Sequence, residues 1–213
     1  MRHYLKLSSC LLLLFTACSA PYKHLGLQKQ PAPSALEYKP VFSRVLYRCI
    51  ADGGFIFKKF HLSGLLFFKA AENGTIRAIY QNEMGYTFFD FEWDNKDSFK
   101  VNKIIPQLDK PAVIKTLRKD FELLLMKRLG KNETIYKKDE ALYHRFELER
   151  GYAYYVEDNG NLIRIENAGE KKKVITIELK KKEKNAMPEA AFFKHHKAHF
   201  IIQLNKIDQD VNE

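Results

Sequence analysis

The feature that most constrains this chain is a series of short segments in which β-branched and aromatic residues alternate with polar ones. Their period of two is the period of a half-buried β-strand. The chain has 16 Phe, 11 Tyr and 1 Trp, which favours strands and a wide apolar interior over a helical bundle. About ten such segments lie between residues 45 and 207, separated by turn residues such as Asn-Gly and Asp-Gly. The pattern predicts an antiparallel meander.

A flat sheet of this width would expose long edges, so we expect it to curl on itself as a barrel. One amphipathic helix, from Lys110 to Leu129, interrupts the strands. Asp109 can cap it, Pro111 suits its first turn, and Gly130 follows its end. The helix is expected to pack its apolar stripe on the sheet, as a core helix or as a lid over the open end. The predicted fold is mainly β (α+β), with one main helix.

Alternation also predicts which side chains face inward. In segment 86–93 one parity holds Thr87, Phe89, Phe91 and Trp93, and the other holds Tyr86, Phe88, Asp90 and Glu92. The parity with the two carboxylates is expected outside, and the other parity inside. A single helix leaves room on the concave side for an apolar ligand, and a filled core is the alternative. The residues expected to line this interior are Ile76, Ala78, Tyr80, Phe89, Phe91, Trp93, Phe99, Val101, Leu117, Phe121, Phe200, Ile202 and Leu204.

The N-terminus has the pattern of a secretory signal peptide over residues 1–17, with a basic start and an apolar run from Leu11 to Phe15. The run is far shorter than the ~20 residues of a transmembrane helix. Leu14-Phe15-Thr16-Ala17-Cys18 resembles the lipobox of bacterial lipoproteins, which implies that Cys18 carries covalent acyl groups such as palmitate. We therefore expect a membrane-anchored protein of the bacterial cell envelope.

The chain after Cys18 is expected to form one folded unit behind a tether. Pro21, Pro31 and Pro33 predict a flexible tether over residues 18–40, followed by a single half-open barrel domain over 41–208 and a tail over 209–213. Cys10 leaves with the signal peptide and Cys18 is acylated, so Cys49 has no partner for a disulfide. Ser19 behind the Cys resembles the residue of lipoproteins sorted to the outer membrane, facing the periplasm.

Three stretches resemble the family of LolA/LolB-like lipoprotein carriers and receptors. Arg77-Ala-Ile-Tyr-Gln-Asn-Glu-Met-Gly-Tyr-Thr-Phe-Phe-Asp-Phe-Glu92 is similar to paired strands around a turn in the receptor. The stretch from Asp109 to Leu125 is similar to the helix that follows, and Met187-Pro188 with the final strand is similar to the end of the receptor. The turn departs from the family pattern, because Glu83 and Met84 replace Pro-Leu.

The resemblance implies an unclosed β-barrel lidded by helices, with a cavity that binds acyl chains during lipoprotein or lipid localisation to the outer membrane. Its implied partners are the membrane, an acylated lipoprotein cargo and a periplasmic carrier protein, and we expect a monomer. Met84, at a turn tip, is the candidate membrane-contact residue, with Phe55 as a second candidate. An ordinary turn residue is the alternative for each. For the whole protein, the alternative is an accessory scaffold lipoprotein with a packed core.

Signals for catalysis and metal binding are weak. No Gly-x-Ser-x-Gly, His-Glu-x-x-His, Cys-x-x-Cys or phosphate-binding Gly loop occurs, so we expect no enzyme and no cofactor besides the covalent lipid. His195, His196 and His199 are the only metal-like group, but their spacing on a hairpin does not suit one ion. The carboxylates of Asp90 and Glu92 are explained by solvated alternation.

Charge is the remaining clue. The net charge is +10, but an exported lipoprotein rarely meets nucleic acid, so we do not expect it as a partner. Two basic runs, Lys171–Lys173 and Lys180–Lys184, flank one strand. They are either solvated loops or contacts to anionic lipid headgroups.

Overall fold

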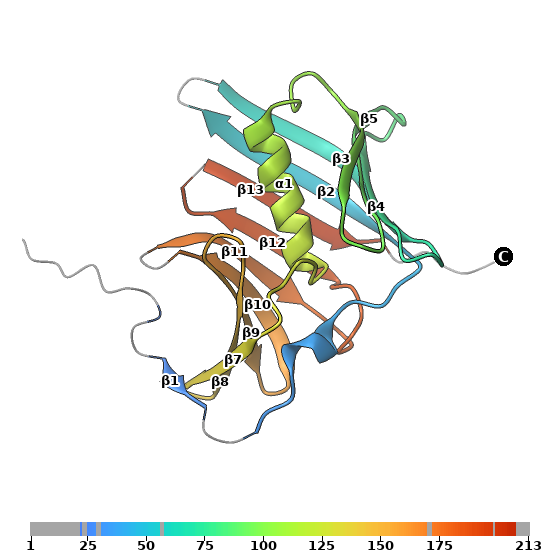
Figure 1. Ribbon diagram of the computed structural model, residues 1–213. Coiled ribbons are helices and arrows are strands. Elements are labelled where there is room, and N and C mark those ends of the chain that lie inside the picture. Colours follow the sequence, from blue (N-terminus) through green and yellow to red (C-terminus); the bar gives the residue numbers. More distant parts are fainter. Residues whose placement is uncertain are drawn as a thin grey trace, which may run out of the picture.

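A computed structural model of the chain describes residues 22, 25–28, 31–55, 58–169, 172–197 and 199–207 (Figure 1). The expected signal peptide, Cys18, Lys171 and the expected tail lie outside the described residues. The helices are α1 (Pro111–Leu124) and the 3-10 helix η2 (Ala35–Tyr38). The strands are β1 (Gly26–Leu27), β2 (Arg44–Phe55), β3 (Lys58–Ala70), β4 (Ile76–Gln81), β5 (Thr87–Trp93), β6 (Phe99–Ile104), β7 (Glu133–Lys138), β8 (Ala141–Glu147), β9 (Tyr152–Asp158), β10 (Asn161–Ala168), β11 (Lys173–Lys180), β12 (Ala190–His195) and β13 (His199–Lys206).

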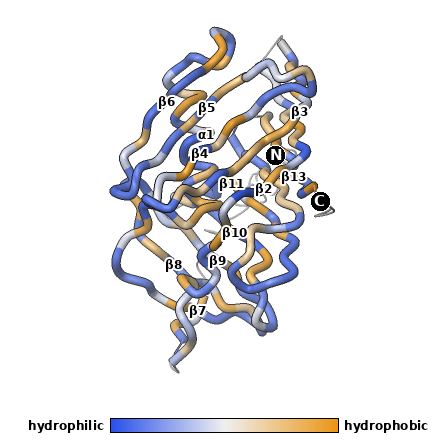
Figure 2. Tube along the Cα trace, turned by 90° about the vertical axis from the view of Figure 1, so that its right-hand side faces the viewer, coloured by the Kyte–Doolittle hydropathy of each residue, from blue (hydrophilic) through white to orange (hydrophobic). Residues whose placement is uncertain are grey.

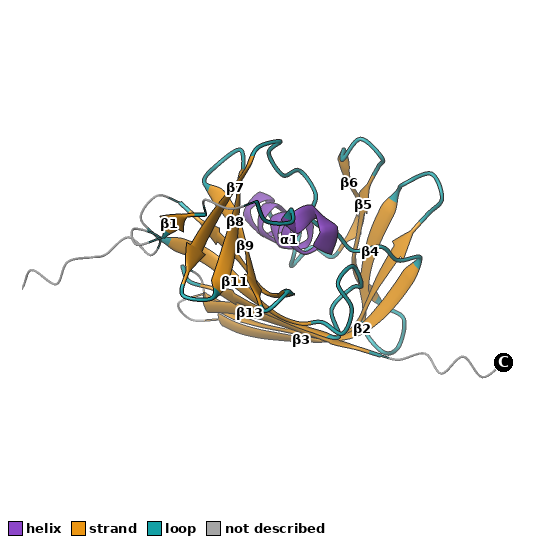
Figure 3. Cartoon of the chain, turned by 90° about the horizontal axis from the view of Figure 1, so that it is seen from below, coloured by secondary structure: helices purple, strands orange, loops and turns teal. Residues whose placement is uncertain are grey.

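All thirteen strands form one antiparallel sheet, in the order β1-β7-β8-β9-β10-β11-β12-β13-β2-β3-β4-β5-β6. The last strand, β13, pairs with β2, so both ends of the folded domain meet in the middle of the sheet. The edges are β1 and β6, and within the described residues no pairing joins them. Seen end-on, the sheet is a half-pipe, with β7–β9 in one wall and β4–β6 in the other (Figure 3). The predicted mainly β, unclosed barrel is confirmed.

Helix α1 crosses the open side of this half-pipe (Figures 1 and 3). It must do so because it follows β6 at one edge of the sheet and precedes β7 near the other. This arrangement confirms one main helix over the concave side. No helix in the described part of the chain is both long and apolar enough to cross a membrane.

The ends of α1 differ from the prediction. Lys110 is the N-cap and makes no side-chain capping bond, so the prediction that Asp109 caps the helix is wrong. The helix stops at Leu124 because Met126 and Arg128 follow with φ of 51° and 55°, in the left-handed region that breaks a helical path. The predicted extension to Leu129 therefore forms an irregular turn.

Asp-Gly pairs were expected in turns between strands, and for Asp52-Gly53-Gly54 this expectation is wrong, because all three residues lie inside β2 and pair with β3. Gly53 is opposite Phe60, and a Cβ at Gly53 would lie 2.2 Å from the Phe60 ring. The glycine therefore allows an aromatic ring to lie across the backbone of a strand. Such a close approach requires a glycine just as a tight turn does.

Three elements were not predicted. Strand β7 has charged residues at both ends, so only Thr134, Ile135 and Tyr136 have the composition of a strand. The backbone pairing with β8 stabilises the remaining residues as a strand. Strand β1 and helix η2 lie in the Pro-rich segment for which an irregular tether was expected. Leu27 of β1 pairs with Tyr136, and Tyr38 of η2 is only 2% exposed.

The interior follows the predicted alternation. Hydrophobic and hydrophilic residues interleave along the strands (Figure 2), and the hydrophobic ones form one buried cluster under α1. Phe91 and Trp93 are fully buried, and Phe89 is 3% exposed, as the parity of β5 predicts. The neighbouring carboxylate of Asp90 lies on the other side of the strand, where it bonds to Arg77 of β4.

Gly64 of β3 tests how closely the strands pack, because a Cβ there would lie 2.1 Å from the carbonyl oxygen of Gln81. Gly64→Ala should lower the free energy of unfolding by about 1–3 kcal/mol, since β3 and β4 must separate to admit the methyl group. Urea unfolding measures the change. Gly169→Ala is the matched control, because a Cβ at Gly169 meets no heavy atom within 4 Å. Equal effects of the two substitutions would contradict this close approach.

Cys49 of β2 tests the burial of the core chemically. Burial raises the pKa of its thiol to about 12. The thiolate, which is the reactive form, is therefore about one part in 10⁴ at pH 8. In a chain carrying Cys10→Ser and Cys18→Ser, we expect negligible reaction with a thiol reagent in buffer and complete reaction in urea. Rapid labelling of the folded chain would show that Cys49 is accessible.

Candidate functional site

The residues predicted to line the interior come together on the concave side of the sheet. All of them belong to the buried apolar cluster or pack against it. Tyr80, Phe89, Ile202 and Leu204 are at most 3% exposed, and Leu117 of α1 is 6% exposed. Their role in holding an acyl chain stays a prediction.

Phe121 of α1 fills the centre of this cluster. Its ring contacts Phe68 of β3, Phe89 of β5 and Trp93 of β5, at centroid distances of 5.6, 5.9 and 6.5 Å. Trp93 in turn contacts Phe99 of β6 at 5.4 Å. The helix therefore places one aromatic side chain among rings from two strands, β3 and β5, and side chains fill the interior directly beneath it.

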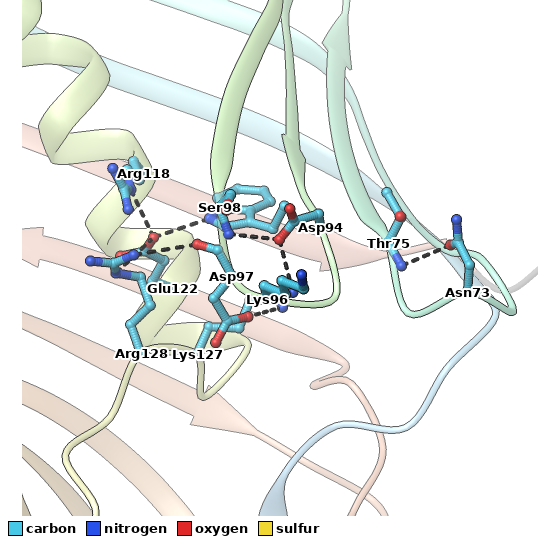
Figure 4. Close-up of polar contacts among 11 residues, drawn as sticks. Asn73, Thr75, Asp94, Lys96, Asp97, Ser98, Arg118, Glu122, Lys127 and Arg128 are labelled. Atoms are coloured by element: carbon cyan, nitrogen blue, oxygen red, sulfur yellow. Dashed lines mark hydrogen bonds and ion pairs between the residues drawn. The ribbon is translucent and has the colours of Figure 1, made fainter.

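Glu122 of α1 is the main polar attachment of the helix to the β4–β6 wall. Its Oε1 accepts a hydrogen bond from Trp93 Nε1 at 3.1 Å and another from Arg118 Nε at 2.7 Å. Arg128 Nε lies 3.9 Å from the same oxygen (Figure 4). The Arg118 guanidinium also covers the Phe99 ring at 4.8 Å. Sequence analysis did not predict this role of Glu122.

The turn between β5 and β6 makes a second attachment, just past the end of α1. Lys127 Nζ donates to Asp97 Oδ1 at 2.5 Å, and Arg128 donates to the Asp97 carbonyl at 3.3 Å (Figure 4). Asp97 itself has a φ of 61°, in the left-handed region. The turn thus holds the residues after α1 through the side chain and the carbonyl of Asp97.

A third attachment is buried. Asp120 Oδ2 lies 2.9 Å from His195 Nε2 of β12, and both side chains are less than 10% exposed. Burial raises the pKa of the Asp120 carboxyl, and His195 opposes that rise. Asp120 follows Leu117 by three positions on the apolar stripe, and this acidic residue among apolar ones is a signal that sequence analysis could have used.

A fourth attachment joins α1 to the other wall. Tyr155 of β9 donates its hydroxyl to the carbonyl of Leu123 at 2.9 Å, which satisfies an acceptor in the last turn of the helix. The four attachments therefore reach β5, the β5–β6 turn, β12 and β9.

The described surface has a cleft of about 510 Å³ beside the C-terminal half of α1. It lies between Asp97 and Lys127 on one side and Leu148 and Glu149 on the other. Basic side chains predominate, and burial lowers the pKa of Lys119, one of its lining residues. A smaller depression of about 290 Å³ lies over β11–β13 and includes Phe192. Neither space includes the aromatic residues of the predicted lining.

A further polar cluster lies under the N-terminal segment and was not predicted. His144 of β8 is fully buried, with Nδ1 2.7 Å from Glu133 Oε1 and Nε2 3.3 Å from Glu157 Oε2. Glu133 also accepts hydrogen bonds from the Ser34 hydroxyl at 2.5 Å and the Ala35 amide at 2.9 Å. The cluster holds η2 against the sheet.

The weaker candidates have structural partners. His195 bonds to Asp120 and His196 bonds to Thr176, while the His199 side chain is not described. Among the described residues, no group of three or more His, Cys, Asp or Glu is arranged to hold a metal ion. Asp90 bonds to Arg77, and Glu92 accepts from Asn102 at 3.0 Å.

Met84 lies in the turn between β4 and β5 and is 93% exposed, beside Tyr86 at 56%. The second candidate, Phe55, ends β2, and its side chain is not described. Membrane contact by Met84 stays a prediction.

Comparison with known proteins finds similarity to solved structures alone. No family model matches the chain, and no curated protein matches it. A LolA superfamily protein from Nitrosomonas europaea is similar in structure, at 7% identity and a TM-score of 0.48, over 82% of this chain and 89% of that one. A domain described as an outer membrane lipoprotein-sorting protein, from Vibrio parahaemolyticus, gives 8% identity and 0.48, over 84% and 91%. A DUF1329 family protein from Desulfovibrio piger gives 8% and 0.43 over the same shares. At these identities the similarity concerns the fold alone.

Glu122→Ala tests the attachment of α1 to the β4–β6 wall. It leaves Trp93 Nε1 and Arg118 without their acceptor, so we expect a loss of about 1–3 kcal/mol of unfolding free energy and faster hydrogen exchange in α1. Urea unfolding and hydrogen exchange measure these effects. Lys115→Ala, at an exposed position of the same helix, is the control. Unchanged exchange in α1 of the Glu122→Ala chain would show that this carboxylate does not hold the helix.

Proposed function

We propose that this protein is a lipid-anchored, non-enzymatic carrier that takes up an acyl chain between α1 and the concave face of the sheet. The observation that supports this most is the position of α1, which covers the open side of an apolar half-pipe and belongs to no strand pairing. A helix held by side chains alone can move aside while the sheet keeps its hydrogen bonds. The proposed cargo is the acyl chain of another lipoprotein, or a lipid in transit to the outer membrane.

Uptake requires that α1 moves, because Phe121 and its aromatic neighbours occupy the space beneath it. An acyl chain would take over the contacts that Leu117 and Phe121 make in the closed form. Binding would come from apolar burial, at ~25 cal/mol per Å². The bonds of Glu122 and Asp120 are the polar contacts that must open first.

The proposed location follows from the sequence. Acylation of Cys18 behind a signal peptide would anchor the protein in the outer membrane, facing the periplasm. A monomer would then receive cargo from an acylated lipoprotein or from a periplasmic carrier protein. We propose no cofactor other than the covalent lipid, and no nucleic-acid partner.

A second candidate function is an accessory scaffold of an envelope complex with a packed core. The observation that favours it is the filled interior, in which Phe91, Trp93 and Phe121 are at most 1% exposed. In that case α1 would be a permanent core helix, and partners would bind the outer surface.

Trp93 provides the test, because it is the only tryptophan of the chain and lies under α1. The full chain carrying Cys18→Ser is titrated with a fatty acid brominated along its acyl chain, which quenches tryptophan at near contact. We expect Trp93 fluorescence to fall by at least half, with no quenching by the unbrominated acid. The control chain carries Trp93→Phe and Tyr86→Trp, which moves the reporter to an exposed turn.

Native mass spectrometry of the same Cys18→Ser chain provides the second readout. A near-stoichiometric mass of bound fatty acyl species supports the carrier. Absence of both bound lipid and Trp93 quenching would reject the carrier and favour the scaffold, whose partners pull-down experiments can then identify.

A further inference from the structure

The N-terminal segment is attached to the outer face of the sheet at Tyr22. The Tyr22 ring stacks on Tyr154 of β9, with centroids 3.9 Å apart and planes within 8°. Its hydroxyl donates to Glu166 Oε2 of β10 at 2.5 Å. Glu166 is fully buried even though alternation along β10 places it on the outer face, and the Tyr22 hydroxyl bonds to it there.

Two cations complete this attachment. Arg164 Nε and Lys173 Nζ lie 2.6 and 2.8 Å from Glu166 Oε1. Lys173 Nζ is also 5.8 Å from the centre of the Tyr22 ring. A buried carboxylate with three partners is costly to separate from them, so the contact fixes Tyr22 on the sheet.

A second contact determines where the segment goes next. Leu27 of β1 pairs with Tyr136 of β7, and the amide of Gln28 donates to the Ile135 carbonyl at 2.9 Å. The described residues of the segment are thus attached at both Tyr22 and β1.

The attachment limits where a lipid anchor can be. Cys18 precedes Tyr22 by four residues, which span at most about 14 Å when extended. If Cys18 is acylated, as the proposed function requires, the membrane surface must lie within that reach of Tyr22. The outer face of β9–β11 is then the part of the fold nearest to the membrane.

The surface beside Tyr22 is basic. Lys173 lies next to Tyr22, and Lys172 is exposed beside it. Glu166 pairs with Thr176, and Thr176 pairs with Lys194, so the three residues form one row across β10, β11 and β12. Neighbouring strands are about 4.8 Å apart, so Lys194 lies two strand spacings from Glu166. Lys197 follows β12 and is exposed. Among the described residues, Lys172, Lys194 and Lys197 have no carboxylate within ion-pair distance.

Three lysines of the second basic run, Lys181, Lys182 and Lys184, make other contacts. Lys181 donates to the carbonyls of Tyr38 and Lys184, at 3.2 and 2.9 Å. Lys182 lies 3.3 Å from Glu189, and Lys184 pairs with Glu37 of η2. These contacts hold η2 at the far end of β11, seven residues or about 23 Å from Lys173. Among the described lysines of the two runs, Lys172 and Lys173 are therefore the ones beside Tyr22.

We propose that this surface, defined as Lys172, Lys173, Lys194 and Lys197 around Tyr22, lies against the anionic lipid headgroups of the membrane that holds Cys18. The basic residues would add an electrostatic contact to the covalent lipid, as two-signal anchoring requires. The protein then rests on the outer face of β9–β12. The concave side with α1 lies on the opposite face of the sheet and stays accessible to cargo.

Binding to vesicles tests the surface without acylation. The full chain carrying Cys18→Ser is mixed with phosphatidylcholine vesicles that contain or lack phosphatidylglycerol. The triple variant Lys172→Glu, Lys194→Glu and Lys197→Glu should bind the anionic vesicles about 100-fold more weakly. The matched control reverses Lys96, Lys100 and Lys103, three exposed lysines near the opposite edge of the sheet. Equal losses in the two triple variants would overturn the proposed surface.

Labelling tests the orientation of the acylated chain. A fluorophore at Lys194→Cys should be quenched by lipid-borne quenchers, whereas one at Met84→Cys should not, because this orientation excludes the membrane contact predicted for Met84 from the sequence. Buried Cys49 should stay unlabelled. Tyr22→Ala should reduce quenching at position 194 while the acylated chain stays bound. Stronger quenching at position 84 than at 194 would reject the orientation. None of these readouts involves acyl-chain uptake, so they would be unaffected if the protein proved not to be a carrier. A chain that is not acylated would be recognised by its mass.

Discussion

The structure depends on the crossing of α1 over the open side of the sheet. The chain leaves β6 at one edge and enters β7 near the other, so the helix must pass over the concave face. That path places Phe121 among rings of β3 and β5, where it covers apolar surface that an unclosed sheet would otherwise expose. The sheet's hydrogen bonds do not depend on α1, so the helix can move without breaking the strand pairing.

Polar contacts at the rim of the apolar cluster decide how the helix is held. Asp120 and Glu122 are two residues apart on α1 but bond to different strands. Glu122 accepts from Trp93 of β5, and Asp120 bonds to His195 of β12. Buried or half-buried carboxylates are stable only when paired, so each contact specifies one position of the helix. Glu166 works in the same way on the outer face, where it holds Tyr22. Three carboxylates thus orient both segments that lie against the sheet.

Sequence patterns predicted the local features of this fold well, because alternation and helical spacing depend only on nearby residues. The inward parity of Phe89, Phe91 and Trp93 is an example. Prediction failed where pairing with distant residues decided the outcome. Gly53 belongs to a strand because Phe60 crosses it, and β7 exists because β8 pairs with it. In α1, Asp120 and Glu122 gained their roles from partners 75 and 29 residues away.

By itself, the sequence determined that the chain is mainly β, which side of each strand is apolar, and that one helix interrupts the strands. Ahead of the fold, residues 1–18 resemble a signal peptide with a lipobox, which stays a prediction. Only the tertiary structure decided that Phe121 fills the interior and that Tyr22 meets Lys173 at a buried carboxylate. The physical reason is that such contacts depend on strand order, register and the curl of the whole sheet. These arise when distant segments bury their apolar faces together, and no local pattern encodes them.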